Sequence, residues 1–288
     1  MRTAVVAGCV GGLLGVLAAV AAPGTVGAGA GAGGPASRTG VVAASRAAPG
    51  GPGGLGATGA TRATGATRGT GATGGPGGRA SSAVGFVAVA EVDASIGQEM
   101  RYATPRNFTG SVVDGYDEPV CLLARPAAEA LRRAQREVLR RGYSLLVYDC
   151  YRPQRAVDRF VRWARDGSDQ SAKAEFYPEV AKDRLIPEGY IAERSGHSRG
   201  STVDVTLTEL GRGALDMGTP FDFFDPLAYT DSPRVTGAAR EHRDLLKRVL
   251  GRQGFVNLPQ EWWHFTYAPE AFPVTHFDFP VSVASVHR

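Results

Sequence analysis

The sequence predicts an α+β fold in which helices flank a central, mainly antiparallel sheet. Residues 126–142 place alanine, leucine and valine at helical spacing, which is typical of an amphipathic helix. Residues 143–150 form a largely apolar run, which is typical of a buried strand. Helical patterns gather early in the patterned region and short strand-like runs come late, and this separation favours an α+β architecture.

Each predicted helix has a recognisable start or end. Pro126 suits the first turn of a helix, and Gly142 suits a C-terminal stop. Pro153 can start a second helix, because its fixed backbone angle already matches the helical one. Residues 238–250 predict a third helix, which Gly251 would close.

The predicted strands are short and bounded by turn residues. Residues 86–90 suggest a strand at the start of the folded part, and residues 203–207 form a β-branched run. Residues 255–257 and 263–267 predict two more strands near the end. Residues 166–194 are expected to be irregular, apart from short helical turns.

Three parts of the chain differ in composition. Residues 1–30 have an early positive charge and an apolar run, which predicts a cleaved export signal, although a retained membrane anchor is the alternative. Residues 31–82 are rich in Gly, Ala, Thr and Pro and predict a disordered linker. Residues 83–288 are long enough for one domain. We expect an extracellular or envelope protein without stable membrane insertion.

The basic character of the chain comes from its first third. Residues 1–90 contain six arginines, no lysine and no acidic residue. Removing these six charges from the formal net charge of +4 leaves −2 for the remaining residues. The high isoelectric point is therefore no sign of a nucleic-acid partner, and we expect none.

Two cysteines remain once the predicted signal is removed. Cys121 and Cys150 could form a disulfide, which an exported protein favours, and two buried thiols are the alternative. Neither cysteine lies in a CxxC motif, which disfavours a cysteine-based metal site.

A histidine and an aspartate seven residues apart form the first candidate metal site. His197 lies in a glycine- and serine-rich turn, and Asp204 lies in the strand predicted directly after it. Both side chains are common zinc ligands, but a site needs at least one more.

A second segment can complete that site. His264 lies in the predicted strand 263–267 and is a candidate third ligand, although a lone histidine among aromatic residues is more often a core residue. Glu261 would project from the preceding turn, beside the metal instead of on it. Two histidines and one carboxylate leave a zinc position for water, whose proton a nearby carboxylate can take.

Three further residues have surroundings that suit a site. Arg152 follows a predicted strand and could stabilise an oxyanion, but a surface salt bridge is the alternative. Tyr102 lies in a loop and could line a pocket or simply pack in the core. Asp222 lies among aromatic residues, where it could face a pocket or cap a turn.

The sequence resembles the VanX-type D-alanyl-D-alanine dipeptidases, zinc enzymes that are related to D,D-carboxypeptidases and to the hedgehog fold. The resemblance spans residues 93–268 and is carried by the paired metal motifs, SGHSRGSTVD at 195–204 and EWWH at 261–264. Further matches are YAT at 102–104, NFTG at 107–110, DCYRPQRAV at 149–157, MG at 217–218 and FDF at 221–223.

The resemblance implies a role for each candidate residue. One Zn²⁺ per chain would be bound by the three residues His197, Asp204 and His264. Glu261 would act as general base and acid, and Arg152 would lie near the scissile carbonyl. The remaining three would hold the charged ends of the dipeptide: Ser195, Tyr102 and Asp222, the last at the ammonium.

The implied reaction is hydrolysis of D-Ala-D-Ala to free D-alanine. A D,D-carboxypeptidase or wall-peptide endopeptidase is the nearest alternative, and a non-catalytic zinc module that binds wall peptide is a third. Glu261 argues against the last, because a structural site needs no base. Gly196 stands where the resistance enzymes commonly have serine. The predicted export favours turnover or scavenging of wall-derived dipeptide outside the membrane.

Overall fold

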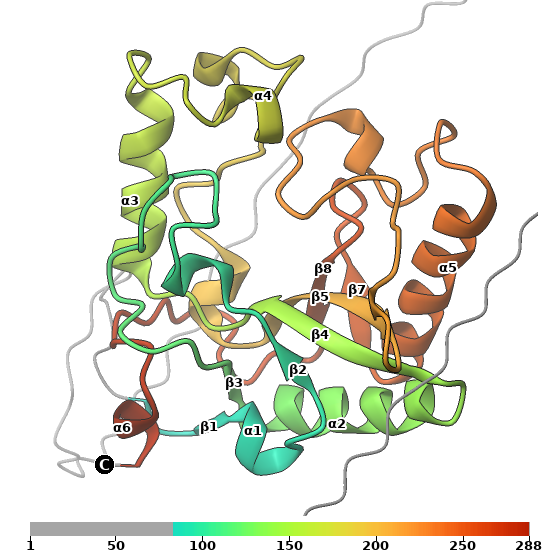
Figure 1. Ribbon diagram of the computed structural model, residues 1–288. Helices are drawn as coiled ribbons and strands as arrows, with labels where there is room; N and C mark the ends of the chain where they lie inside the picture. The colour runs from blue at the N-terminus through green and yellow to red at the C-terminus, as the bar shows by residue number, and fades with distance from the viewer. Residues whose placement is uncertain (1–82, 288) are drawn as a thin grey trace, which may run out of the picture. The chain divides into compact units, whose positions relative to one another are not determined.

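The computed structural model describes residues 83–287, so the predicted export signal and linker lie outside the described residues. Within this part, one six-stranded sheet has the order β2-β4-β5-β8-β7, with β6 paired to β5 (Figure 1). Only β2 and β4 are parallel, which confirms a mainly antiparallel sheet. The strands are β2 (Gly97–Gln98), β4 (Tyr143–Asp149), β5 (Thr202–Glu209), β6 (Gly213–Ala214), β7 (Phe255–Asn257) and β8 (His264–Tyr267).

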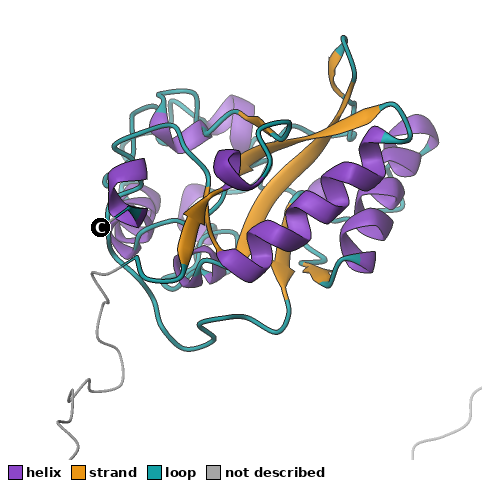
Figure 2. Ribbon diagram, turned by 90° about the horizontal axis from the view of Figure 1, so that it is seen from below, coloured by secondary structure: helices purple, strands orange, loops and turns teal. Residues whose placement is uncertain are grey.

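Two long helices pack against each other and against this sheet. They are α2 (Arg125–Leu139) and α5 (Gly237–Arg252), and they lie along one side of the strands (Figure 2). Pro126 lies in the first turn of α2, as predicted. The apolar stripe of α2 is fully buried, and it consists of Ala127, Ala130, Leu131, Ala134 and Val138. Burial of one helical face is what holds such a helix in place.

A third helix, α3 (Gln154–Arg165), follows the end of β4 and packs away from α2 and α5 (Figure 1). Pro153 is its N-cap residue, which agrees with the predicted start. Residues 166–194 contain only short helical turns, as expected. The shorter helices are α1 (Val89–Val92), α4 (Lys173–Phe176), α6 (Val283–Val286), η1 (Arg101–Ala103), η2 (Lys182–Arg184), η3 (Gly196–Arg199) and η4 (Pro226–Ala228).

The predicted strand at residues 86–90 is wrong in its extent and lies outside the main sheet. Strand β1 (Phe86–Ala88) pairs only with β3 (Leu122–Ala124), and the chain then enters α1. The strand is short because β3 offers just three residues before α2 begins.

Cys121 and Cys150 form a disulfide with a Cα–Cα distance of 5.3 Å. Both residues are fully buried, and the bond links the start of β3 to the end of β4. The backbone that leads from β4 into α3 is therefore fixed covalently.

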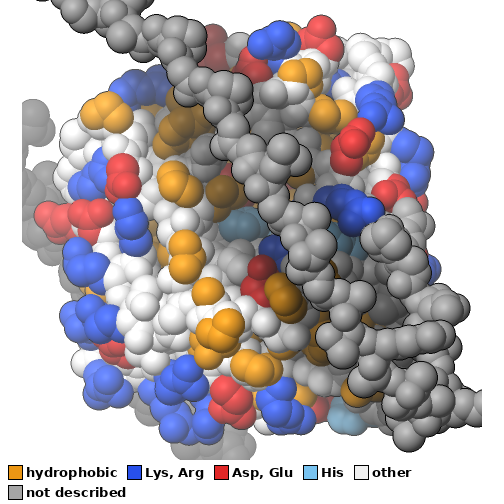
Figure 3. All heavy atoms as spheres, turned by 180° about the vertical axis from the view of Figure 1, so that it is seen from behind, with side chains coloured by type: hydrophobic (Ala, Val, Ile, Leu, Met, Phe, Trp, Pro, Cys, Tyr) orange, Lys and Arg blue, Asp and Glu red, His pale blue; other side chains and the backbone are white. Residues whose placement is uncertain are grey.

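The surface of the described part mixes charges of both signs. On the face in Figure 3, Lys and Arg side chains are interspersed with Asp and Glu. None of the helices within residues 83–287 has the length and apolar content that crossing a bilayer requires.

Candidate active site

Neighbouring strands bring three of the site's side chains together. Asp204 on β5 pairs directly with His264 on β8, and on its other side with Asp149 on β4. Residues directly opposite one another on antiparallel strands point to the same face, so all three side chains reach one end of the sheet.

His197 comes from η3, the short helix just before β5. Ser195 caps this helix, and its Oγ accepts a hydrogen bond of 3.2 Å from the His197 backbone N–H. Gly200 then turns the chain into β5 with a φ of 76°, and a Cβ at this position would overlap the Phe86 ring. The sequence predicted a polar turn here, and the structure forms one turn of 3₁₀ helix.

Three potential ligand atoms form an almost equilateral triangle. The distances are 3.2 Å from His197 Nε2 to His264 Nδ1, 3.2 Å from His197 Nε2 to Asp204 Oδ1, and 3.2 Å from His264 Nδ1 to Asp204 Oδ1. Within the described residues, this is the one such cluster that could hold a metal ion.

The triangle fits Zn²⁺. Tetrahedral zinc with bonds of about 2.0–2.1 Å separates its ligand atoms by about 3.3 Å. His197 Nδ1 lies 2.7 Å from the Cys150 carbonyl oxygen, which can only accept, so this nitrogen carries the proton and Nε2 presents a lone pair. Asp204 Oδ1 is buried and has no hydrogen-bond partner. Atoms of this kind facing one another call for a cation between them.

The pKa shifts also mark a place that favours positive charge. Burial opposes the charged form of His264, but the Asp204 and Glu261 carboxylates beside it outweigh burial and raise the pKa of His264 to about 9. Burial likewise opposes the Asp204 carboxylate, yet the two histidines hold the pKa of Asp204 well below its usual value. The site therefore keeps its carboxylate ionised.

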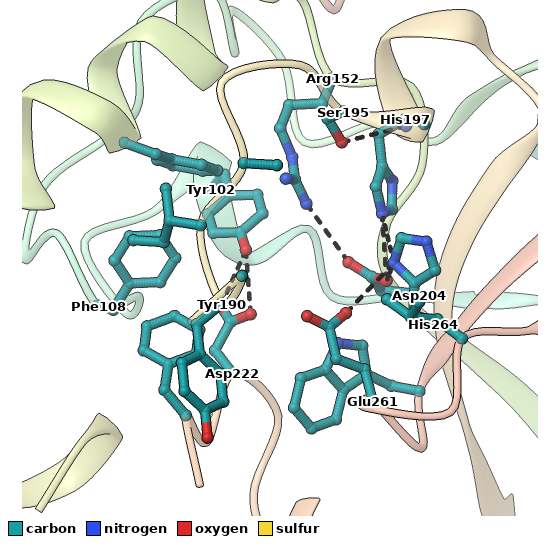
Figure 4. A pocket seen from close by; sticks show the side chains of 18 of the residues that line it. Tyr102, Phe108, Arg152, Tyr190, Ser195, His197, Asp204, Asp222, Glu261 and His264 are labelled. Carbon is teal, nitrogen blue, oxygen red and sulfur yellow. Dashed lines mark hydrogen bonds and ion pairs between the residues drawn. The ribbon is translucent and has the colours of Figure 1, made fainter. Parts of the chain in front are cut away.

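Glu261 lies in the turn before β8, as the sequence predicted. Its Oε2 is 3.3 Å from His264 Nδ1, and its side chain is 18% exposed. Figure 4 shows the carboxylate pointing into the cavity beside the histidines. Glu261 is not one of the three residues whose ligand atoms cluster, and a carboxylate beside such a cluster can take a proton from water.

Arg152 is not a surface residue. Its guanidinium lies 2.9 Å from Asp149 Oδ2 and 3.5 Å from Asp204 Oδ2. It also lies 5.0 Å above the rings of Tyr102 and Phe160. The side chain therefore points into the cavity (Figure 4), where a partial negative charge could meet it.

Asp222 and Tyr102 form the opposite wall of the cavity (Figure 4). The Tyr102 hydroxyl donates to Asp222, with distances of 2.9 and 3.2 Å to the two carboxylate oxygens. Asp222 adopts a φ of 60°, a left-handed conformation that is uncommon outside glycine and is often found at functional sites. Burial raises the pKa of Asp222 well above its usual value, and the negative charge of Asp204 adds to the effect.

A cavity of about 180 Å³ joins the two walls, and all eight residues that the sequence singled out for catalysis, metal or substrate line it. Sequence reasoning missed its apolar lining, which includes Phe108, Phe160 and Tyr190. It also gave no role to Asp149 behind the wall. The spacing of Asp149 and Arg152, with the acid at a strand end, was the signal that could have found it.

Comparison with known proteins agrees with this geometry. Residues 82–282 match the peptidase M15 family described as D-ala-D-ala dipeptidase. A D-alanyl-D-alanine dipeptidase of Enterococcus faecalis is 40% identical over 199 residues, which cover 69% of this chain and 98% of that protein. A D-alanyl-D-alanine dipeptidase of Streptomyces coelicolor is 41% identical over 198 residues, which cover 68% of this chain and 98% of that protein. A D-alanyl-D-alanine dipeptidase of Escherichia coli is 31% identical over 185 residues, which cover 64% of this chain and 86% of that protein.

The chain belongs to the D-Ala-D-Ala dipeptidase family. A solved structure of the vancomycin-resistance D,D-pentapeptidase VanY, a mutant in complex with Zn(II), is 17% identical. The match covers 54% of this chain and 77% of the VanY chain, with a TM-score of 0.32.

Gly196 lies in the cavity wall between Ser195 and His197. A Cβ at Gly196 would lie 2.9 Å from Thr202 Oγ1, which is too close without a shift. Thr202 Oγ1 is itself tied to Thr266 Oγ1 at 2.9 Å. The cavity wall at Gly196 is therefore bare backbone, and Thr202 fills the space that a side chain would need.

Proposed function

We propose that this protein is a zinc-dependent dipeptidase that hydrolyses D-alanyl-D-alanine to two molecules of D-alanine. One observation supports this most directly. A single small cavity joins a His-Asp-His ligand triangle, an adjacent carboxylate and a second buried carboxylate on the opposite wall. The first two suit hydrolysis of a peptide bond, and the third suits a free amino terminus. The relatives that match the same part of the chain are named D-alanyl-D-alanine dipeptidases.

His197, Asp204 and His264 would hold Zn²⁺, which when bound polarises the substrate carbonyl and acidifies water. Glu261 takes a proton as the water oxygen attacks the carbonyl carbon, and it delivers that proton to the amide nitrogen as the C–N bond breaks. Arg152, aimed into the same space, stabilises the negative charge that develops on the carbonyl oxygen.

The two walls orient the dipeptide. Its ammonium meets Asp222, because that carboxylate has no cationic partner among the described residues within ion-pair distance. Ser195 lies beside Arg152, away from Asp222 (Figure 4), so the carboxylate end of the dipeptide falls there. An acyl group on the substrate nitrogen would remove the ammonium and with it the ion pair to the buried Asp222, which disfavours longer peptides.

The test is to incubate the purified full-length chain, loaded with zinc, with D-Ala-D-Ala or with N-acetyl-D-Ala-D-Ala and to measure released D-alanine. We expect kcat/KM to favour the free dipeptide by about 100-fold or more. A preference for the acetylated peptide would point to a D,D-carboxypeptidase. Zinc binding without release from either substrate would point to a non-catalytic module, and both outcomes would refute the proposal.

We further propose that the protein is exported and acts on wall-derived dipeptide outside the membrane. The apolar run in residues 1–30 supports export, and the Cys121–Cys150 disulfide suits an oxidising compartment. Amino-terminal sequencing of the protein from culture medium and envelope fractions would test this. Recovery of an uncleaved, reduced protein from the cytoplasm alone would contradict it.

A further inference from the structure

Asp149 is a buried carboxylate directly behind the active site. It lies at the end of β4, is fully buried and does not line the cavity. Its Oδ1 accepts a 2.6 Å hydrogen bond from the Tyr116 hydroxyl, and its Oδ2 accepts from Nε and Nη2 of Arg152, both at 2.9 Å. Without contact to the substrate, Asp149 can act only through its neighbours.

Arg152 lies between two carboxylates. Asp149 and Asp204 are opposite each other on β4 and β5, and the guanidinium is 2.9 Å from the first and 3.5 Å from the second. The Asp204 oxygen that faces Arg152 is Oδ2, whereas Oδ1 faces the two imidazoles. The position of Arg152 therefore decides how much of the Asp204 charge is left for a metal ion.

Loss of the Asp149 charge would change that balance. A buried guanidinium without its partner is costly, and Asp204 is the carboxylate within reach. Arg152 would close onto Asp204 and form a charge-assisted pair with it. That pair would compete with a divalent cation for the same carboxylate.

We infer that Asp149 is a positioning residue, which holds Arg152 away from Asp204 and so keeps Asp204 available to a divalent cation. The same contact aims the guanidinium into the cavity. A rival route exists, because Asp149 Oδ2 is also 3.4 Å from His197 Nδ1 and could orient that ligand directly. The two routes differ in whether Arg152 is required.

A double-mutant cycle distinguishes the route through Arg152 from the direct route through His197. Zinc affinity is measured for the full-length metal-free chain, by competition with a chromophoric chelator, for wild type, Asp149→Asn, Arg152→Gln and the double variant. We expect Asp149→Asn to lower zinc affinity by about 10–100-fold. The zinc affinity of the double variant should return to within about 3-fold of that of wild type, because the Arg152 guanidinium no longer competes with zinc for Asp204.

A double variant that binds zinc as weakly as Asp149→Asn would overturn the inference, since Asp149 would then act without Arg152. Wild-type affinity in Asp149→Asn would overturn it as well. Asp225→Asn is the matched control, because Asp225 is also a buried carboxylate paired with an arginine, Arg234, but lies outside the cavity lining. Its zinc affinity should equal that of wild type.

If Asp149→Asn does not fold, as judged by thermal unfolding, Arg152→Gln alone still tests the inference. Removal of the Arg152 guanidinium should leave zinc affinity equal to or above that of wild type. A tenfold or larger fall in zinc affinity would refute the inference. The role of Arg152 in turnover rests on the proposed function, but zinc affinity does not. If the four zinc affinities are as expected but the protein does not cleave D-Ala-D-Ala, only the proposed function is refuted.

Discussion

The two walls of the cavity carry one buried carboxylate each, and their surroundings push the two pKa values in opposite directions. Asp204 is 2% exposed and Asp222 is 5% exposed, so burial alone cannot separate them. Burial alone would raise the pKa of Asp204, but the two histidines beside it outweigh burial and hold that pKa far below the usual value. Asp222 has the Tyr102 hydroxyl as its hydrogen-bond partner, and burial raises its pKa well above the usual value.

The difference shows how one cavity divides its tasks. A carboxylate that stays ionised suits a permanent metal ligand. A carboxylate whose charge is not compensated by the protein suits a site where the substrate itself brings the positive charge. The Asp204 wall therefore suits a metal ion that stays bound, and the Asp222 wall suits the ammonium group of a substrate that binds and leaves.

The largest expected effect comes from removing the ionised carboxylate. Asp204→Ala should lower kcat/KM for D-Ala-D-Ala by about 10³-fold or more, because the ligand triangle loses a corner. Zinc content after dialysis should fall in parallel. Glu209→Ala changes an acidic residue near the other end of the same strand and should leave both values unchanged. Full zinc content in Asp204→Ala would show that Asp204 is not a ligand.

The next effect separates metal binding from proton transfer on the same wall. Glu261→Ala should keep its zinc but lower kcat by about 10²–10⁴-fold, since Glu261 handles the proton without holding the ion. Zinc content and steady-state rates from one preparation provide the comparison. Normal hydrolysis by this variant would show that another group is the base.

A smaller effect should appear on the opposite wall. Asp222→Asn should lower kcat/KM for the free dipeptide by about 100-fold and leave that for the N-acetyl dipeptide nearly unchanged, because only the former has an ammonium. Zinc content should not change. Tyr102→Phe, which removes one hydrogen bond and keeps the carboxyl group of Asp222, should lower kcat/KM by only about 3–10-fold. An equal loss with both substrates would mean that Asp222 does not select the amino terminus.

The smallest effect is on stability. The raised pKa of Asp222 means that the folded protein binds this proton more tightly than the unfolded chain does. The wild type therefore loses stability as pH rises from the unfolded pKa through the folded one, and Asp222→Asn does not. In zinc-free protein we expect the variant's Tm to be about 2–4 °C higher near neutral pH, with no difference at about pH 4. A lower Tm for the variant at neutral pH would contradict this assignment.

Much of the Asp204 wall could be predicted from local sequence. A polar turn followed directly by a β-branched run places His197 just before a strand and Asp204 near the start of that strand. Glu261 and His264 are close in sequence because a turn leads straight into β8. Spacing of this kind constrains geometry strongly, since a strand alternates its faces with a period of two.

The Asp222 wall could be identified only through the family resemblance. Tyr102 and Asp222 are 120 residues apart, and neither lies in a strand. The residue patterns around them fit a packed aromatic and a turn cap equally well. Only the packing of distant loops decided that the two meet across from the metal ligands.

The sequence by itself determined the α+β class and the helix starts at prolines, because propensity and periodicity act over short stretches. It also singled out the three residues that cluster as candidate metal ligands. Tertiary structure decided the parallel pairing of β2, the extent of β1 and the surroundings of Asp149. Electrostatics belongs to this second group. A carboxylate takes its pKa from whatever charges and burial the fold brings to it, and residues far apart in the chain supply those.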